Sequence, residues 1–254
     1  MIPRCLTIAS SDSGGGAGIQ ADLKAFAGAG CFGMSAIVAL TAQNTREVRG
    51  VHEVPPEFVR AQIEAVFDDI GVDAAKTGML FSAAIIEAAA DVLAEHPVPL
   101  VVDPVMIASS GARLLRADAV ETLVGRLFPL ATVVTPNLPE ARALAGDGGP
   151  AELARRIHDL GAAAVIVTGG HAEEPADVLY DGREVLTIRV ERHETGATHG
   201  AGCTHSATLA ALLARGFSLA DAAREAAHVA SDAVASGLAE LGGGEGPVDV
   251  LHLR

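Results

Sequence analysis

The sequence contains few aromatic residues and very few lysines. Tryptophan is absent, tyrosine occurs once, and aromatic residues make up 3% of the 254 positions. Because half of the residues are hydrophobic, the core must be built from Ala, Val, Leu and Ile. The only lysines are Lys24 and Lys76, and the formal net charge is −14. A nucleic-acid or anionic-membrane partner needs a basic surface, so we expect neither.

Cysteines and long apolar runs are also scarce. Cys5, Cys31 and Cys203 are widely spaced and odd in number, which predicts neither a disulfide framework nor a zinc site. No segment approaches the roughly 18 consecutive apolar residues of a membrane span. The N-terminus lacks a basic region followed by an apolar run. We therefore expect a soluble protein of the cytoplasm.

Apolar stretches alternate with helical patterns along the chain. Buried strands are predicted at residues 5–9, 35–42, 74–80, 98–102, 132–135 and 163–168. Helices are predicted at residues 19–28, 57–69, 82–95, 117–127, 151–160, 207–216 and 219–238. Residues 178–190 form a hairpin pattern across Asp181-Gly182. With no linker in between, residues 1–254 are expected to form one doubly wound α/β domain, mostly parallel, with a small antiparallel addition.

Polar or glycine-rich segments follow most of the predicted strands. Gln43 follows the strand at 35–42, Asp103 follows that at 98–102, and Glu140 lies just beyond that at 132–135. Since parallel strands joined by right-handed crossovers end at one edge of the sheet, these groups should share one cleft. Asp103 suits a metal ion, although it could instead cap its own loop. Glu140 could hold the same metal or favour the start of the next helix.

The segment 198–206 carries the strongest chemical pattern. Gly200 and Gly202 allow several backbone N–H groups to point into one concavity, just before a helix at 207–216. A helix N-terminus favours an anion, above all phosphate. Cys203 lies at this turn, where we expect its thiol to lose a proton more easily and to act as a nucleophile or base. The alternative is a glycine-bearing loop before a buried helix.

Other patterns fit no standard motif. The loop at 10–18 matches neither the dinucleotide fingerprint nor a Walker loop, and we interpret it as a tight backbone wall against a small ligand. The spacing of His171, His193, His199 and His205 fits no metal site. We interpret these histidines as solvated or core residues, with His171 as a candidate for the lining of a nucleotide pocket.

Six motifs in register resemble the hydroxymethylpyrimidine/phosphomethylpyrimidine kinases of thiamine biosynthesis, members of the ribokinase-like superfamily. They lie at residues 10–24, 41–45, 76–80, 102–106, 135–141 and 198–204, so the resemblance covers essentially the whole chain. It implies a three-layer α/β/α sandwich. It also implies transfer of the γ-phosphoryl group of MgATP to the hydroxymethyl group of an aminopyrimidine, then to the resulting monophosphate. Relatives of this kind are commonly homodimers.

The resemblance also implies roles for single residues. Substrate contacts fall on Ala17, Asp22, Gln43, Met79 and Val105, and Mg²⁺ falls to Asp103 and Glu140. The anion hole is formed by Gly200, Ala201, Gly202 and Cys203, with Cys203 as the base. Nucleotide contacts fall on Thr168, Gly170 and Thr198.

Four positions depart from the family pattern. Ala201 replaces a threonine, Thr168 and Ser109 replace lysines, and Ser10 replaces a glycine. The missing lysines require positive charge near the nucleotide to come from Mg²⁺ or another residue. A pyridoxal or pyridoxine kinase on the same scaffold stays open as an alternative, as does a catalytically silent pyrimidine-binding relative.

Overall fold

The structure is a computed structural model that describes residues 1–106, 115–169 and 176–253. The predictions made for Ser109, Gly170 and His171 lie outside the described residues.

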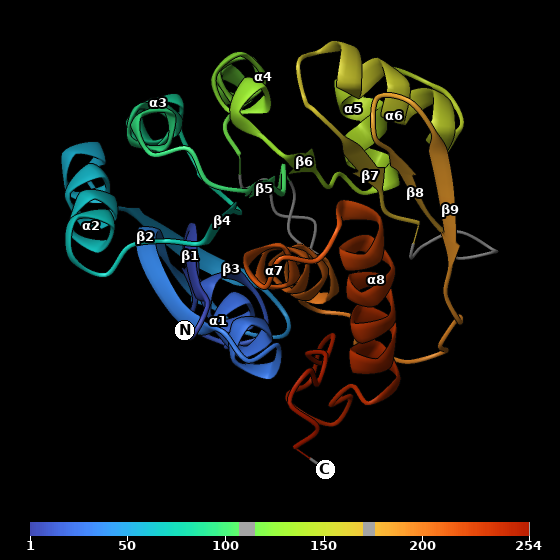
Figure 1. Cartoon of the computed structure of the whole chain (residues 1–254). Coiled ribbons are helices and arrows are strands. Elements are labelled where there is room, and N and C mark those ends of the chain that lie inside the picture. Colours follow the sequence, from blue (N-terminus) through green and yellow to red (C-terminus); the bar gives the residue numbers. More distant parts are fainter. Residues whose placement is uncertain (107–114, 170–175, 254) are drawn as a thin grey trace.

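One nine-stranded sheet runs through the molecule in the order β3-β2-β1-β4-β5-β6-β7-β8-β9 (Figure 1). The six strands from β2 to β7 in this order are parallel, whereas β3 at one edge and β8 and β9 at the other are antiparallel additions. The strands are β1 (Arg4–Asp12), β2 (Phe32–Gln43), β3 (Val48–Glu53), β4 (Ala74–Thr77), β5 (Leu100–Val102), β6 (Val133–Val134), β7 (Val165–Val167), β8 (Ala176–Tyr180) and β9 (Val185–Arg189).

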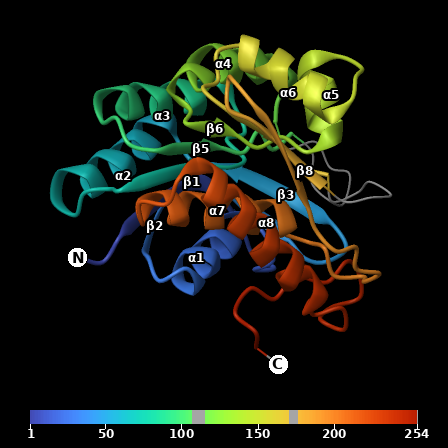
Figure 2. The same ribbon diagram turned by 45° about the vertical axis from the view of Figure 1, so that its right-hand side comes forward.

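Helices cover both faces of the sheet, which makes a three-layer α/β/α sandwich (Figures 1 and 2). One layer consists of α1 (Gly18–Gly28), α7 (Ala201–Ala214) and α8 (Leu219–Ala235). The other consists of α2 (Pro56–Asp69), α3 (Ala83–Glu95), α4 (Val120–Arg126), α5 (Leu138–Ala145) and α6 (Pro150–Asp159). The predicted fold class is confirmed.

The buried strands supply both halves of the core because successive side chains point to opposite faces. In β5, Leu100 and Val102 pack towards the α2–α6 layer, whereas Val101 packs towards α1, α7 and α8. Helix α7 is buried along most of its length and is rich in alanine, which lets it approach the sheet closely. This position carries the N-terminus of α7 to the middle of the sheet edge (Figure 1).

Most predicted elements are confirmed, with four differences. No range was predicted for helix α5, an eight-residue helix that starts with Leu138-Pro139 shortly after β6. Strand β3 was missed because four of its six residues are exposed and its sequence, VRGVHE, shows no regular apolar alternation. Strand β4 ends at Thr77, so Gly78 to Leu80 belong to a loop. Helix α7 begins at Ala201, six residues before the predicted run of helix formers. The predicted hairpin corresponds to β8 and β9.

The continuous sheet supports the single domain predicted for residues 1–254, which we retain as a proposal. In the described part of the chain, all helices are too short or too polar to span a membrane.

Candidate active site

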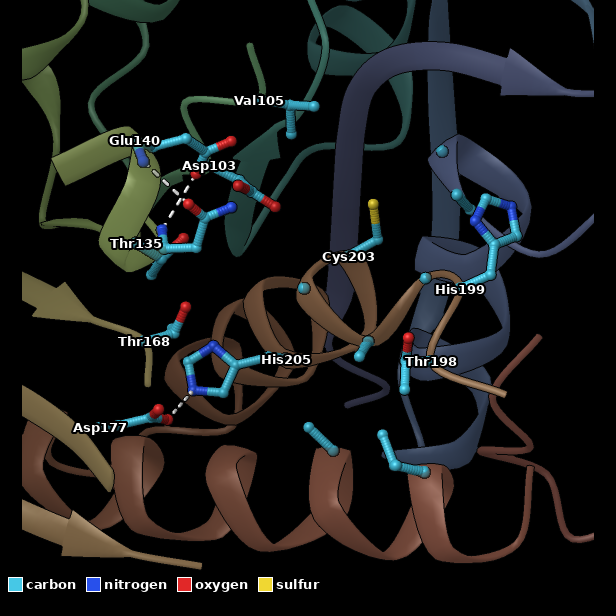
Figure 3. Close-up of a pocket in the computed structure, with 18 of the residues that line it drawn as sticks. Asp103, Val105, Thr135, Glu140, Thr168, Asp177, Thr198, His199, Cys203 and His205 are labelled. Atoms are coloured by element: carbon cyan, nitrogen blue, oxygen red, sulfur yellow. Dashed lines mark hydrogen bonds and ion pairs between the residues drawn. The ribbon is translucent and has the colours of Figure 1, made fainter. Parts of the chain in front are cut away.

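A cleft of about 730 Å³ lies at the carboxyl ends of the parallel strands (Figure 3). The loops after β1, β2, β4, β5 and β6 line it, together with the N-terminus of α7. The predicted site residues that line it are Ala17, Gln43, Met79, Asp103, Val105, Glu140, Thr168, Thr198, Gly200, Ala201, Gly202 and Cys203. The structure therefore brings these residues together at one cleft, as the order of strands and loops in the sequence led us to expect.

The N-terminus of α7 supplies free amide groups to this cleft. The backbone N–H groups of Gly202 and Cys203 donate to no other group among the described residues, whereas the N–H of Thr204 bonds to the carbonyl of Gly200. Gly200 has a φ of +86°, and a Cβ added there would lie 1.8 Å from the carbonyl oxygen of Gly16. Only glycine fits this close contact between two loops, and the result is an anion-binding turn.

The thiol of Cys203 points into the cleft near several charged groups (Figure 3). Burial, with smaller contributions from the carboxylates of Asp22 and Asp103, raises the pKa of Cys203 to about 12 against the opposing effect of Lys76. The amide of Gly18 also donates to the sulfur. The expected ease of proton loss is therefore wrong for the protein without ligands, because these surroundings keep the thiol protonated at neutral pH.

A buried ion pair supports the floor of the cleft. Lys76 Nζ lies 2.9 and 3.0 Å from the two carboxylate oxygens of Asp22, and both side chains are fully buried. Thr7 donates to the same carboxylate at 2.6 Å. Burial works against the charged amine, but Asp22, Cys203 and Asp103 together raise the pKa of Lys76. The residue is a fixed cation under the site.

Asp22 itself does not line the cleft, and its carboxylate reaches the pocket only through Lys76. Lys76 lines the cleft and was not among the predicted site residues. A signal was present in the sequence, since one of only two lysines stands inside the apolar strand β4 of an acidic chain. A lysine there has to be paired with a buried carboxylate.

Asp103 and Glu140 present two carboxylates to the same cleft as Cys203 (Figure 3). Asp103 Oδ2 accepts a hydrogen bond of 2.9 Å from the hydroxyl of Ser206 in α7. Glu140 completes a capping box at the start of α5, where its carboxylate accepts from the N–H of Asn137 at 3.0 Å. The side chain of Asn137 accepts in return from the N–H of Glu140 at 2.9 Å.

The electrostatics of these carboxylates favour a bound cation. Burial and the charge of Asp103 together raise the pKa of Glu140 to about 8. Burial also raises the pKa of Asp103, against the opposing effects of Lys76 and Ser206. Hard carboxylate oxygens are the donors that Mg²⁺ prefers, usually one or two of them with substrate phosphates and water. No cluster of three or more ligating side chains occurs in the described ranges, so the protein would supply two ligands.

A second buried pair joins the loop after β1 to the loop before α7. His199 Nε2 lies 3.0 Å from Asp12 Oδ2, and both residues line the cleft. Asp12 also accepts from the backbone N–H groups of Gly14, Gly16 and Ala17 at 2.7, 3.1 and 2.9 Å. Burial opposes its charge, but the bonds from His199 and these amides lower the pKa of Asp12. The prediction of a solvated or core histidine missed this contact across 187 positions.

Gln43 and the apolar side chains lie around the opening near Ala17. The backbone of Gln43 exchanges hydrogen bonds of 2.8 Å with the hydroxyl of Ser13. Its side-chain oxygen accepts from Thr41 at 3.2 Å, which leaves the amide nitrogen without an acceptor among the described residues. Met79 and Val105 add apolar surface to the same cleft. This wall can hold a flat heteroaromatic ring.

The remaining predicted nucleotide contacts lie at the end of β7 and before α7. The hydroxyl of Thr198 donates to the carboxylate of Glu245, so it is already engaged. Thr168 lines the cleft beside His205 and Asp177 (Figure 3). Asp177 also accepts from the N–H of Gly169 at 3.0 Å.

Comparison with solved structures identifies the class of protein. The chain is similar to an ADP complex of Bacillus subtilis pyridoxal kinase, with a TM-score of 0.91, 39% sequence identity and 100% of both chains covered. The sheet order and the cleft are thus those of a kinase with the ribokinase-like fold.

Comparison with protein families is more specific. A family model described as phosphomethylpyrimidine kinase matches residues 12–249, and the chain belongs to this family. It is 49% identical to a hydroxymethylpyrimidine/phosphomethylpyrimidine kinase of Rhizobium meliloti, with 97% of this chain and 96% of the relative covered. It is also 49% identical to a thiamine biosynthesis bifunctional protein of Geobacter sulfurreducens, of which it spans about half, with 96% of this chain and 51% of that protein covered.

Proposed function

We propose that the protein transfers the γ-phosphoryl group of ATP to 4-amino-5-hydroxymethyl-2-methylpyrimidine and then to its monophosphate, in thiamine biosynthesis. Membership of the phosphomethylpyrimidine kinase family and the names of the relatives support this activity. The observation that carries the proposal is the shared position of these groups. The free amides and the thiol at the N-terminus of α7 line the same cleft as the carboxylates of Asp103 and Glu140. Phosphoryl transfer depends mainly on such positioning and charge stabilisation.

The pyrimidine is held at the wall formed by Ala17, Gln43, Met79 and Val105. The free amide nitrogen of Gln43 donates to a ring nitrogen, and its oxygen can also accept from the exocyclic amino group. Met79 and Val105 cover the ring with apolar contacts. This placement turns the hydroxymethyl arm towards Cys203 and the amides of Gly202 and Cys203.

The transferring phosphoryl group is stabilised by the N-terminus of α7. The new bond joins the substrate oxygen to the γ-phosphorus, the bond from this phosphorus to the bridging oxygen breaks, and ADP leaves. The N–H groups of Gly202 and Cys203 are already oriented and donate to the equatorial oxygens. Lys76 adds a fixed positive charge beneath them.

Mg²⁺ is proposed as the cofactor, with Asp103 and Glu140 as its protein ligands. When bound, it neutralises charge on the β- and γ-phosphates. The raised pKa values of the two carboxylates fit this assignment, since a bound cation would favour their charged forms.

The hydroxyl proton of the substrate moves to Cys203. Only the thiolate can accept it, and Asp103 is one of the groups that raise the pKa of the thiol. Neutralisation of the Asp103 charge would therefore favour the thiolate, while Lys76 stabilises it already. A weak base is sufficient, because the loose transition state of phosphoryl transfer needs little help with deprotonation.

Replacement of Cys203 tests this proposal. Cys203→Ala should retain pyrimidine binding but lose most of the turnover, on the order of the 10²–10⁴-fold that a positioned acid or base contributes. Steady-state ADP release and calorimetric titration with the pyrimidine measure the two properties. A variant that keeps a nearly wild-type rate would contradict the role of Cys203 as base.

A pyridoxal kinase is the second candidate function. The solved pyridoxal kinase with a TM-score of 0.91 favours it, and both substrates are flat heteroaromatic rings with a hydroxymethyl arm. Turnover with pyridoxal, compared with that of the pyrimidine at equal concentration, separates the two functions.

We also propose that the protein forms a homodimer. Leu40 on β2 and Val51 on the edge strand β3 leave apolar surface exposed, at 46% and 37% of their areas. Light scattering after gel filtration measures the molar mass and hence the oligomeric state. A monomer mass at micromolar concentration would contradict the proposed homodimer. The cytoplasmic location predicted from the sequence stays a prediction.

A further inference from the structure

A buried histidine–aspartate pair lies on the wall of the cleft formed by α7 and β8. His205 Nε2 lies 3.2 Å from Asp177 Oδ2, and the two residues are 5% and 6% exposed. The N–H direction is poorly aligned for a hydrogen bond, so the contact is one between a ring nitrogen and a charge. The other oxygen of Asp177 accepts from the N–H of Gly169 at 3.0 Å, which fixes the carboxylate in place.

The second ring nitrogen of His205, Nδ1, faces away from this pair. Nδ1 makes no hydrogen bond with any described residue, and it points away from Asp177, on the side of Thr168 and Asp103 (Figure 3). The residue lines the cleft. A polar group that is almost fully buried and faces a pocket needs a ligand atom or water as its partner.

The charges around the ring are nearly all negative. Asp177 faces it from β8, and Asp103 after β5 interacts with it electrostatically. Glu140 of α5 lies beyond Asp103, and Cys203 precedes it on its own helix. Lys76 of β4 is held by Asp22.

The last element packed near the ring adds no charge. The residues of α8 that line the cleft are Ala227, Ala230, Ser231 and Val234. Thr168 at the end of β7 is uncharged as well. Arg192, which follows β9, also lines the cleft. Among the described lining residues of α7, β8 and α8, His205 is the one side chain that can carry a positive charge.

The protonation state of the His205 imidazole determines whether Nδ1 can donate a hydrogen bond to an anion. The neutral ring carries one N–H, and an N–H on Nε2 facing Asp177 leaves Nδ1 as an acceptor, which repels an anion. The imidazolium donates from both nitrogens. Binding of an anion at Nδ1 would therefore favour uptake of one proton by the ring.

We propose that His205 binds the polyphosphate of the nucleotide: its Nδ1–H donates to a phosphate oxygen, while the carboxylate of Asp177 faces Nε2. The proposal rests on the proposed phosphoryl transfer for its choice of ligand. His205 thus provides, from α7, a positive charge that the end of β7 does not supply. It is a nucleotide-binding residue and takes no part in moving the substrate proton.

The test compares ADP with adenosine, which lacks the phosphates, on the whole protein. Calorimetry without any pyrimidine gives both affinities for the wild type and for His205→Leu. One charge-assisted hydrogen bond supports a loss of about tenfold or more in ADP affinity. Adenosine affinity should change less than about twofold, because the bond is made to phosphate alone. In kinetics, the KM for ATP should rise while that for the pyrimidine stays constant.

Proton uptake gives an independent readout. For the wild type, the heat of ADP binding above neutral pH should depend on the ionisation enthalpy of the buffer, and this dependence should disappear in His205→Leu. His158→Leu is the matched control, since His158 lies on α6 outside the cleft, against Tyr180. It should leave both the ADP affinity and the proton uptake unchanged.

Each outcome bears on the proposal. Equal losses for ADP and adenosine, or none for either, would overturn it and would leave His205 as a packing residue. If His205→Leu does not fold, His205→Gln keeps one neutral donor and should show a smaller loss for ADP without proton uptake. ADP binding that ignores His205 would leave the proposed kinase activity intact, whereas absence of any ADP binding would contradict both.

Discussion

At the scale of single residues, the site combines one thiol with charges of both signs at close range. Cys203 lies between Lys76, which stabilises its thiolate, and Asp22 and Asp103, which oppose it. The helix N-terminus alone predicts an acidic thiol. Burial outweighs this effect, and the pKa of Cys203 is raised to about 12.

The buried pair of Lys76 and Asp22 should contribute to stability in a strongly non-additive way. Lys76→Met leaves the Asp22 carboxylate buried without its partner, which costs about 3–5 kcal/mol. The double variant Asp22→Asn/Lys76→Met should cost less, because no buried charge is left over. Urea unfolding of the three proteins measures both values. If Lys76→Met were as stable as the double variant, the cost of an unpaired buried Asp22 carboxylate would be contradicted.

Asp12 should make the free energy of unfolding depend on pH in the acidic range. Its pKa is lowered below the ordinary value of 3.8 by His199 and the loop amides, against the effect of burial. A carboxyl group of this kind stabilises the fold above its unfolded pKa and loses that effect as the pH falls through the folded pKa. The wild type should exceed Asp12→Asn in unfolding free energy at neutral pH, and the difference should shrink below pH 3.8.

Chemical denaturation across this pH range is the measurement for Asp12. A difference between the two proteins that grows with acidification would mean that the lowered pKa has another origin than the folded contacts.

At the scale of elements, the turn from Thr198 into α7 depends on one glycine. Gly200→Ala would bring a Cβ against the carbonyl oxygen of Gly16 at 1.8 Å, in a backbone region with φ of +86° that disfavours side chains. We expect a loss of stability of more than about 1 kcal/mol and loss of turnover, because the two loops must separate.

Gly202→Ala is the matched control for stability. Gly202 lies two residues further on, has no positive φ, and has open space where its Cβ would be. This variant should unfold within about 0.5 kcal/mol of the wild type. Equal destabilisation by the two substitutions would contradict the close approach of the loops at Gly200.

The sequence predicted the elements that carry a regular apolar pattern, and with them the place of the cleft. Gln43, Asp103 and Glu140 could be located because they follow buried strands. Pairs such as His199 with Asp12 and Lys76 with Asp22 could not, since their partners lie 187 and 54 positions away. Strand β3 could not be predicted either, because an exposed edge strand needs no apolar alternation.

At the scale of the whole molecule, the doubly wound sheet brings all these segments to one edge. The strand order places β1, β4, β5 and β6 side by side, and the loops that follow them carry Ala17, Met79, Asp103 and Glu140. Helix α7 lies between α1 and α8 in one helical layer (Figure 1), and its N-terminal residues line the same cleft. The fold thus places the proposed pyrimidine wall and the proposed anion-binding turn around a single cleft.

The most direct test of the account is coupled ADP release with MgATP and, in separate reactions, the hydroxymethylpyrimidine, its monophosphate and pyridoxal. The account predicts turnover with both pyrimidines and little with pyridoxal. Preference for pyridoxal would contradict the proposed substrate and favour the second candidate function. Absence of ADP release with all three, while the ligands still raise the melting temperature, would contradict catalysis itself.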